Sequence, residues 1–286
     1  VGAMSTENFV SFGEQGAQLT YGSYLRLPQL LDAQHLESDP PAHDELLFIT
    51  IHQVYELWFK QLLHEANALQ RALEQGKTHR SLAILGRMRN IMKTCVSQLD
   101  ILETMTPLQF NSFRDRLSSA SGFQSAQFRE LEAVLGRRDQ AGATAEKSSG
   151  MGMAEHLVPG SPQRARVEDA MQRPSLWDSA LVYFNSRMPM PKSALERDVT
   201  LAWEPSEQVQ QALIELHRND PEASMVGEAL VDLDEGLQEW RYRHVKMVER
   251  TIGRKMGTGG SSGAGYLAST LFNPVFPDLW AIRSQF

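Results

Sequence analysis

Two histidines of this chain lie where their chemistry could be used. Of the eight histidines, only His52 and His244 fall on the apolar face of a long predicted helix. A neutral imidazole is a good ligand for iron or zinc and a good acid or base near neutral pH. For either residue alone, a core histidine bonded to a backbone carbonyl is the more frequent arrangement. Because the two lie on the two most strongly patterned helices, antiparallel or crossing helices could bring them face to face across a cavity.

The sequence lacks the motifs of several metal sites, which limits the kinds of metal that these two histidines could bind. The zinc spacings H-E-x-x-H and C-x-x-C are absent, and Cys95 is the only cysteine. A non-haem iron site needs a carboxylate beside two histidines, and neither helix offers one in register. A porphyrin iron needs only one axial histidine and a large apolar cavity. The spacing permits this last site, with the second histidine on the distal side, but does not single it out.

Arg114 is a third candidate, because it lies one turn after Phe110 on an otherwise apolar face. The planar fork of an arginine suits a bidentate clamp for a substrate carboxylate. The alternative is a side chain whose stem packs on the protein while its head pairs with Asp115 or a glutamate. The residues alone leave both interpretations open.

A glycine-rich loop and two tyrosines complete the candidates. The loop GTGGSSGAG spans residues 257–265, follows a predicted helix and lacks the lysine of a P-loop. Its glycines would allow a lid over a site, with Thr258 among its hydroxyl groups, and a plain linker is the alternative. Tyr21 and Tyr24 could pack within a short helix or form aromatic walls for a ligand of an adjacent chain.

The elements that must position these residues are predicted to be helices. Apolar residues recur at steps of three and four over 48–73, 79–104 and 226–252, which is the pattern of one helical face. Asp44 is the expected N-cap of the first of these helices. Strand patterns are scarce, so we expect an all-α bundle with long helices. Shorter helices are predicted over 19–31, 106–117, 123–136, 166–172, 174–184, 206–217 and 266–272.

The composition is that of a globular protein of 286 residues, and its net charge of −7 argues against nucleic acid as the main partner. No stretch approaches the roughly 20 apolar residues of a membrane span. No secretory signal opens the sequence, so we expect a cytoplasmic protein. Val1 to Ala3, ahead of Met4, is typical of a vector remnant. We expect a flexible N-terminus over 1–17, a single domain over 18–286, and a mobile connection over 137–163.

Long stretches of the chain resemble the tryptophan 2,3-dioxygenases. They occur in the family's order from about residue 18 to the end, and the resemblance is weakest between 137 and 229. The stretches that carry it are LTYGSYLRL (19–27), FITIHQVYELWFKQLLHE (48–65), LETMTPLQFNSFRDRLSSASGFQSAQFRELE (102–132) and EWRYRHVKMVERTIG…GTGGSSG (239–263). The resemblance implies an all-α bundle around a b-type haem. It also implies cleavage of the indole C2–C3 bond of L-tryptophan by O2 to give N-formyl-L-kynurenine, the first step of tryptophan catabolism by the kynurenine pathway.

The resemblance also implies a role for each matched residue. His244 corresponds to the axial ligand of the haem iron, and His52 to a catalytic residue on the distal side, near the indole N–H. Phe48 corresponds to a residue that packs on the indole, and Arg114 to the residue that binds the substrate carboxylate. Phe110 lies where members of the family carry tyrosine or phenylalanine.

Further matched residues concern the edge of the haem, the loop and the neighbouring subunit. Ser121 and Gly122 correspond to residues along the haem edge. Thr258 corresponds to a residue that holds the substrate's ammonium and carboxylate groups. The resemblance also implies a homotetramer, a dimer of dimers, in which an N-terminal segment covers the indole bound by a neighbour; that segment corresponds to Tyr21, Tyr24 and Leu25.

Two other functions stay open at this point. A relative in natural-product biosynthesis would keep the haem and both histidines but insert a single oxygen atom into a tryptophan derivative. A non-catalytic haem-binding or sensing bundle would have no need of both a carboxylate clamp and a lid. The expected partners are L-tryptophan or a derivative and O2, with no nucleic acid and no membrane.

Overall fold

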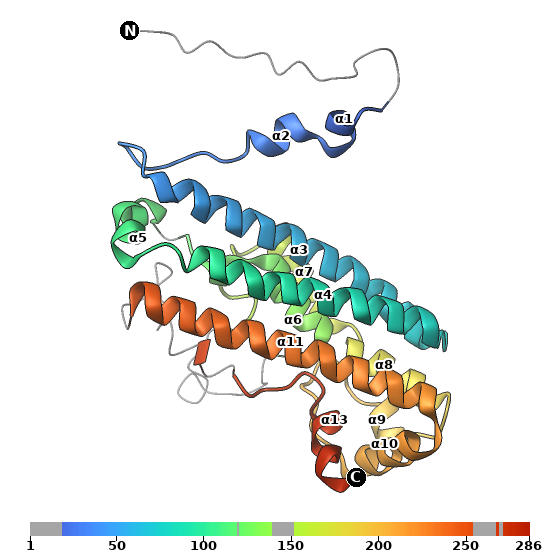
Figure 1. Cartoon of the computed structure of the whole chain (residues 1–286). Helices are drawn as coiled ribbons and strands as arrows, with labels where there is room; N and C mark the ends of the chain where they lie inside the picture. The colour runs from blue at the N-terminus through green and yellow to red at the C-terminus, as the bar shows by residue number, and fades with distance from the viewer. Residues whose placement is uncertain (1–18, 119, 139–151, 254–266, 269–270) are drawn as a thin grey trace.

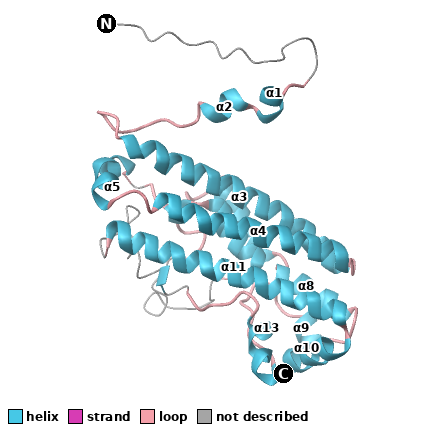
Figure 2. Ribbon diagram, viewed as in Figure 1, coloured by secondary structure: helices cyan, strands magenta, loops and turns pink. Residues whose placement is uncertain are grey.

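The protein was analysed as a computed structural model, which describes residues 19–118, 120–138, 152–253, 267–268 and 271–286. Every regular element within these ranges is a helix, joined to the next by turns and loops, as Figure 2 shows. The predicted all-α class is therefore confirmed. None of the described helices combines the length and the apolar character that crossing a membrane requires.

Three long helices form the centre of the bundle. They are α3 (His43–Glu74), α4 (Thr78–Leu102) and α11 (Pro221–Ile252), and α4 packs against both of the others (Figure 1). A tight turn joins α3 to α4, and Gly76 in this turn has a φ of +66°. A backbone with this φ is open to glycine at no steric cost. The turn therefore lets α4 run back along α3.

The starts of two long helices differ from their predicted positions. α3 begins at His43 with Ala42 as its N-cap, so the prediction that Asp44 is the N-cap is wrong. The reason lies in Glu45, the residue after Asp44. Its carboxylate accepts hydrogen bonds from the backbone N–H groups of Glu37 and Ser38 at 2.8 and 3.1 Å, so the segment before α3 folds back on the start of the helix. Asp44 still lies in the first turn, where a carboxylate complements the helix dipole.

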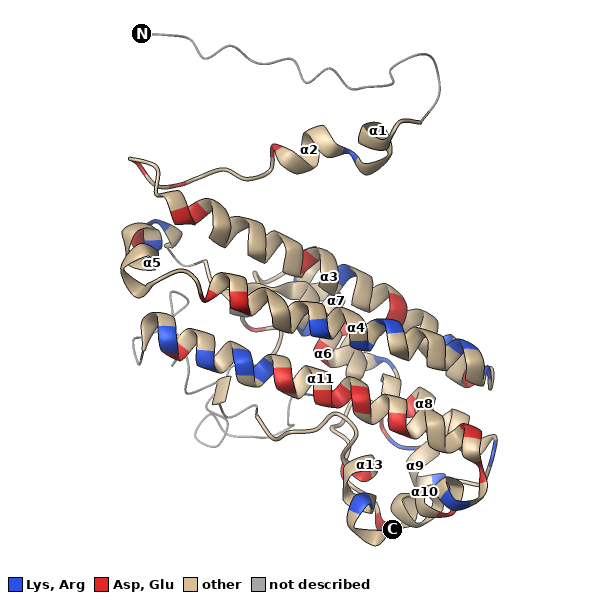
Figure 3. Ribbon diagram, viewed as in Figure 1, with Lys and Arg blue, Asp and Glu red and all other residues tan. Residues whose placement is uncertain are grey.

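α11 begins five residues before the predicted position, at Pro221. The side chain of Asp220 accepts a hydrogen bond from the N–H of Ala223 at 3.0 Å, and proline occupies the first turn. Both features are typical of a helix start. The acidic side chains of α11 lie mainly in its first half and the basic ones in its second half, as Figure 3 shows. This order also complements the helix dipole.

Smaller helices surround this centre. The predicted helix over 19–31 is divided at Arg26, whose φ is 53°. α5 starts with a capping box between Thr106 and Gln109. The smaller helices are α1 (Tyr21–Leu25), α2 (Leu27–Leu31), α5 (Pro107–Arg114), α6 (Ala126–Leu135), α7 (Pro162–Gln172), α8 (Leu176–Asn185), α9 (Lys192–Leu195), α10 (Glu207–Asn219) and α13 (Pro277–Ala281), with 3-10 turns at Asp115–Leu117, Gly122–Gln124 and Ile282–Gln285.

Two other predicted segments are described only in part. Of the connection expected over 137–163, residues 139–151 lie outside the described residues. Its last part forms turns in which Met153 and Leu157 are buried, so this part packs on the bundle. Of the short helix expected over 266–272, only Leu267 and Ala268 are seen as helical, and Leu271 and Phe272 form a turn.

Candidate active site

A cavity of about 510 Å³ lies between α3, α5, α6 and α11. Its volume is in the range of pockets that hold small molecules and cofactors. Most of its wall is apolar, with aromatic and aliphatic side chains from these helices. Seven of the residues predicted for the site line it: Phe48, His52, Phe110, Arg114, Ser121, Gly122 and His244.

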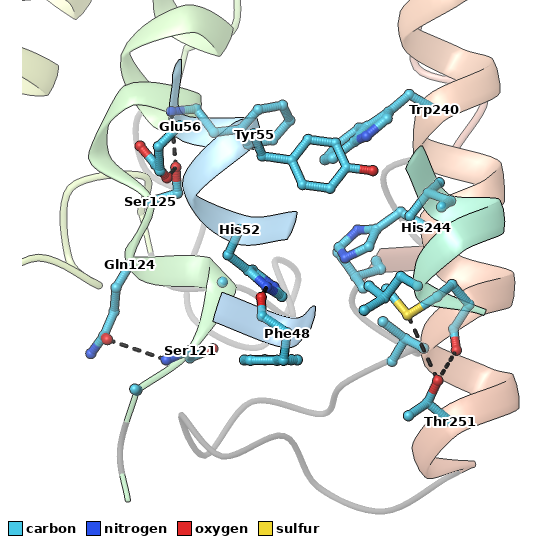
Figure 4. Close-up of a pocket in the computed structure, with 18 of the residues that line it drawn as sticks. Phe48, His52, Tyr55, Glu56, Ser121, Gln124, Ser125, Trp240, His244 and Thr251 are labelled. Atoms are coloured by element: carbon cyan, nitrogen blue, oxygen red, sulfur yellow. Dashed lines mark hydrogen bonds between the residues drawn. The ribbon is translucent and has the colours of Figure 1, made fainter. Parts of the chain in front are cut away.

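His52 lies on α3, one turn after Phe48, and its ring points into the cavity (Figure 4). Its Nδ1 atom lies 2.7 Å from the carbonyl oxygen of Phe48. Because a carbonyl can only accept a hydrogen bond, we assign the proton of the neutral ring to Nδ1, which leaves Nε2 as an acceptor. Burial lowers the pKa of His52, and the Phe48 bond and the charge of Glu56 only partly oppose this. The ring is therefore neutral at neutral pH.

His244 reaches the cavity from α11, on the side opposite His52 (Figure 4). Its ring stacks on that of Trp240, with 5.1 Å between the ring centroids and 19° between the planes. Burial, with smaller effects from His52 and Arg129, lowers the pKa of His244 to about 4. A neutral imidazole keeps the lone pair that a metal ion needs. The predicted arrangement of two histidines facing each other across a cavity is thus present in the structure.

Aromatic side chains from α3 and α5 form one end of the cavity. The ring centroid of Phe48 lies 5.6 Å from those of Phe110 and Phe113. Arg114 is the last residue of α5, and its partly buried side chain lines the cavity beside them. A guanidinium at an apolar, water-poor wall is well suited to bind a carboxylate.

Glu56 is a cavity residue that the sequence analysis did not single out. It lies one turn after His52 on α3. A glutamate at this spacing from a candidate histidine is the sequence feature that could have identified it. Its carboxylate accepts hydrogen bonds from Ser125 Oγ at 2.5 Å and from Gln127 Nε2 at 2.8 Å. These bonds join α3 to the start of α6, next to the segment of Ser121 and Gly122.

A second missed feature is a charged cluster in the cavity wall. The carboxylate of Glu132, which is 3% exposed, contacts Arg129, Arg137 and Arg241 at 2.7, 2.8 and 3.0 Å. Burial alone would raise the pKa of Glu132, but these three arginines lower it to about 2. One anion among three cations leaves a surplus of positive charge at this end of the cavity. Arg129 and Glu132 lie one turn apart on α6 and Arg137 follows shortly after, but Arg241 comes from α11, and its approach could not be found from the sequence.

The residues around the cavity fit a haem better than a bare metal ion. Within the described ranges, no group of three or more His, Cys, Asp or Glu side chains could hold a metal ion. A haem needs one neutral axial histidine and an apolar cavity of this size, which His244 and the aromatic walls offer. The buried Nε–H of Arg129 has no hydrogen-bond partner among the described residues. Such a donor favours an anionic group, which the carboxylates of a haem would supply. The residues present therefore fit a haem.

Three predicted site residues do not line this cavity, and a fourth lies outside the described residues. Tyr21 and Tyr24 on α1 are 77% and 71% exposed, and Leu25 beside them is also exposed. α1 and α2 lie apart from the helices that enclose the cavity (Figure 1). Thr258, with the rest of the glycine-rich loop, lies outside the described residues.

Comparison with known proteins agrees with this geometry. A sequence model of the family described as tryptophan 2,3-dioxygenase matches residues 4–149 and 206–286. The gap between these ranges lies within the stretch where the resemblance was expected to be weakest.

Curated relatives match nearly the whole chain. A tryptophan 2,3-dioxygenase of Anaeromyxobacter sp. (strain K) is 55% identical over 272 residues, which cover 93% of this chain and 96% of the relative. The enzyme of Herpetosiphon aurantiacus is 53% identical over 268 residues, 93% of this chain and 98% of its own length. The enzyme of Nocardioides sp. is 50% identical over 284 residues, 98% of this chain and 99% of its own length. The chain belongs to the tryptophan 2,3-dioxygenase family.

Proposed function

We propose that this chain catalyses the O2-dependent opening of the indole C2–C3 bond of L-tryptophan, which gives N-formyl-L-kynurenine. One observation carries the proposal: two neutral histidines face each other across an apolar cavity whose wall also holds Arg114. The family membership supports it further, because the relatives that cover nearly the whole chain carry this activity in their names.

His244 would bind the iron of a b-type haem, and Ser121 and Gly122 would line the haem. When bound, the haem supplies the iron that activates O2. The contribution of the chain is an apolar cavity and the imidazole of His244, which stays neutral. Arg129, Arg137 and Arg241 supply the positive charge that balances the carboxylates of the haem.

The remaining cavity residues would bind and orient L-tryptophan. Arg114 would bind its carboxylate, Phe48 would pack on the indole ring, and Phe110 would form the wall beside it. His52 would accept a hydrogen bond from the indole N–H, because its Nε2 is the free acceptor of the neutral ring. Orientation is the main contribution, since the C2–C3 bond must lie against the site of O2 activation. An indole N–H is a very weak acid, so His52 orients the ring and is not an essential base.

The N-terminal helix suggests how the site is completed. Tyr21, Tyr24 and Leu25 form an exposed apolar group on α1, which lies apart from the cavity of its own chain. We propose that they cover the indole in a neighbouring subunit of a homotetramer, and that Thr258 closes over the amino and carboxylate groups of the substrate. A cytoplasmic location stays a prediction.

The proposal is tested by turnover of the reduced, haem-loaded protein with L-tryptophan and O2. We expect chromatography and mass spectrometry to identify N-formyl-L-kynurenine as the product. A protein that binds haem but converts neither tryptophan nor any other indole amino acid would instead be a non-catalytic haem-binding bundle.

A further inference from the structure

Glu56 carries a charge next to His52 that the proposed mechanism has not used. We propose that Glu56 is a positioning residue for substrate recognition: its fixed carboxylate strengthens the hydrogen bond that His52 Nε2 accepts from the indole N–H. The inference rests on the proposed function, because it needs tryptophan in this cavity. Glu56 would thereby help the site to select substrates that carry a ring N–H, although it does not contact the substrate.

The position of the carboxylate is fixed by α6. Ser125 Oγ donates to one oxygen at 2.5 Å, and Gln127 Nε2 donates to the other at 2.8 Å. The same Gln127 amide also lies 2.8 Å from the backbone carbonyl oxygen of Glu56. Ser125 in turn caps the start of α6 by accepting from the N–H of Phe128 at 3.3 Å. Figure 4 shows Glu56 and Ser125 together at the cavity wall, above His52.

The charge of Glu56 is not neutralised by a neighbouring cation. Its hydrogen-bond donors are neutral groups, and among the described residues no ion pair involves Glu56. Glu132, the other acid in the cavity wall, contrasts with it, because three arginines surround that carboxylate. The negative charge of Glu56 therefore acts on groups in the cavity, whereas the three arginines neutralise the charge of Glu132.

His52 is the group that this field acts on most directly. Side chains four residues apart on a helix have Cβ atoms about 5–6 Å apart, and the cavity wall has a lower dielectric than water. The charge of Glu56 raises the pKa of His52, although burial, the largest effect, leaves it below its usual value. The other charged or titratable groups that line the cavity are Tyr55, Arg114, Arg129, Glu132, Arg137, Arg241 and His244. Among the charged groups, Glu56 is the one that shifts the pKa of His52.

The consequence is a better acceptor at Nε2. A more basic nitrogen accepts a stronger hydrogen bond, and the low dielectric of the cavity strengthens it further. No proton is transferred in this step, because the indole N–H keeps its hydrogen. Glu56 should therefore act on the binding of substrates that carry a ring N–H and not on analogues that lack it.

The test compares two ligands that differ only at the ring position that faces His52. L-Tryptophan and 3-benzothienyl-L-alanine share the fused rings, the amine and the carboxylate, but sulfur replaces the N–H in the second. Dissociation constants are measured for the ferric haem-loaded protein, where no turnover occurs. We expect wild type to prefer tryptophan by about tenfold, which is the value of one hydrogen bond, and Glu56→Gln to reduce this preference to about threefold.

Two further variants set the lower and upper limits of the preference for tryptophan. His52→Phe removes the acceptor itself, so the preference for tryptophan should disappear. Glu65→Gln is the matched control, because Glu65 is also an acid of α3 but does not line the cavity. That variant should keep the preference of wild type. The affinity of Glu56→Gln for the sulfur analogue should also stay unchanged.

Two outcomes would overturn the inference: a preference in Glu56→Gln equal to that of wild type, or an equal loss of affinity for both ligands. Absence of tryptophan binding in wild type would instead refute the proposed function. If Glu56→Gln does not fold, the same ratio is measured in Gln127→Met, which releases the carboxylate from one of its two donors. A preference about twofold below wild type is then expected, and an unchanged preference contradicts the inference.

Discussion

At the scale of single residues, the two histidines owe their chemistry to burial. Burial lowers the pKa of both rings, so each keeps a lone pair at neutral pH. Their surroundings then separate their roles. His52 is fixed by the carbonyl of Phe48 and presents Nε2 as a hydrogen-bond acceptor, whereas His244 stacks on Trp240 at the opposite wall. Under the proposed function, the same type of side chain would serve substrate binding at one wall and cofactor binding at the other.

The role of His244 predicts loss of the cofactor on its replacement. In His244→Ala the cavity keeps its apolar walls but loses its axial ligand. We expect haem content, read from the Soret absorbance per chain after purification, to fall to a small fraction of the wild-type value, and turnover to fall with it. His217→Ala is the control, because His217 lies on α10 and does not line the cavity. A His244→Ala protein that retains haem with an unchanged spectrum would contradict the assignment.

The role of Arg114 predicts a defect in substrate binding. A charge-assisted hydrogen bond contributes about 1.5–3 kcal/mol, so Arg114→Ala should raise the KM for L-tryptophan by about 10- to 100-fold. Arg114→Lys keeps the charge but not the planar fork, and an intermediate value is expected. Arg164→Ala, which changes an arginine of α7 outside the cavity, should leave the KM unchanged. A KM for L-tryptophan near the wild-type value in Arg114→Ala would refute the carboxylate clamp.

What the sequence could predict about these residues follows from helical geometry. His52, His244 and Arg114 were found because steps of three and four residues place them on apolar faces. Glu56 and Glu132 were missed because their importance depends on which helices meet. The partners of Glu56 lie 69 and 71 residues away on the chain, and Arg241 lies 109 residues from Glu132.

At the scale of the elements, the long helices could be predicted and their exact starts could not. The apolar periodicity of α3, α4 and α11 is strong, and so their existence and approximate extent are confirmed. The starts depend on side chains that reach back to the backbone, such as the carboxylates of Glu45 and Asp220. Several residues near each start could act as such a cap, and only the fold decides between them.

Replacement by alanine should have opposite effects on stability at two glycines of α4 and the turn before it. Gly76 has a φ of +66° in the turn before α4, so Gly76→Ala should lower the free energy of unfolding by about 1 kcal/mol. Gly86 lies inside α4 with open space around its Cα, so Gly86→Ala should raise it by about 0.5–1 kcal/mol. Urea unfolding measures both, and turnover should stay unchanged. A loss of stability in Gly86→Ala would contradict the description of that site.

At the scale of the whole molecule, the buried histidines couple stability to pH. In the unfolded chain a histidine takes up a proton near pH 6.5, whereas His244 in the folded chain does so only near pH 4. Between these values the unfolded chain binds more protons, so stability must fall as the pH falls through this window. Above pH 6.5 the effect is absent, because the ring is then neutral in both states.

This linkage can be measured on the haem-free protein. Between pH 7 and pH 5 the His244 ring should account for a loss of about 2 kcal/mol in the free energy of unfolding. The loss from this ring should be missing in His244→Phe, whose denaturant midpoint should depend less on pH. The lowered pKa of His52 acts in the same direction, so part of the dependence should remain. Equal pH dependence in wild type and His244→Phe would show that this ring is not buried as described.

The exposed group on α1 is also a feature of the whole molecule. Tyr21 and Tyr24 leave the apolar parts of their rings in contact with water, and a neighbouring subunit would cover them. Their proposed role therefore depends on an assembly in solution.

The central claim is that this cavity cleaves the indole ring of L-tryptophan with both atoms of O2. The most direct measurement is the product mass from reduced, haem-loaded protein given L-tryptophan and isotopically labelled O2. We expect one ring-opened product that contains two labelled oxygen atoms. A product with the ring intact and a single labelled atom would contradict it, and would identify the chain as a monooxygenase.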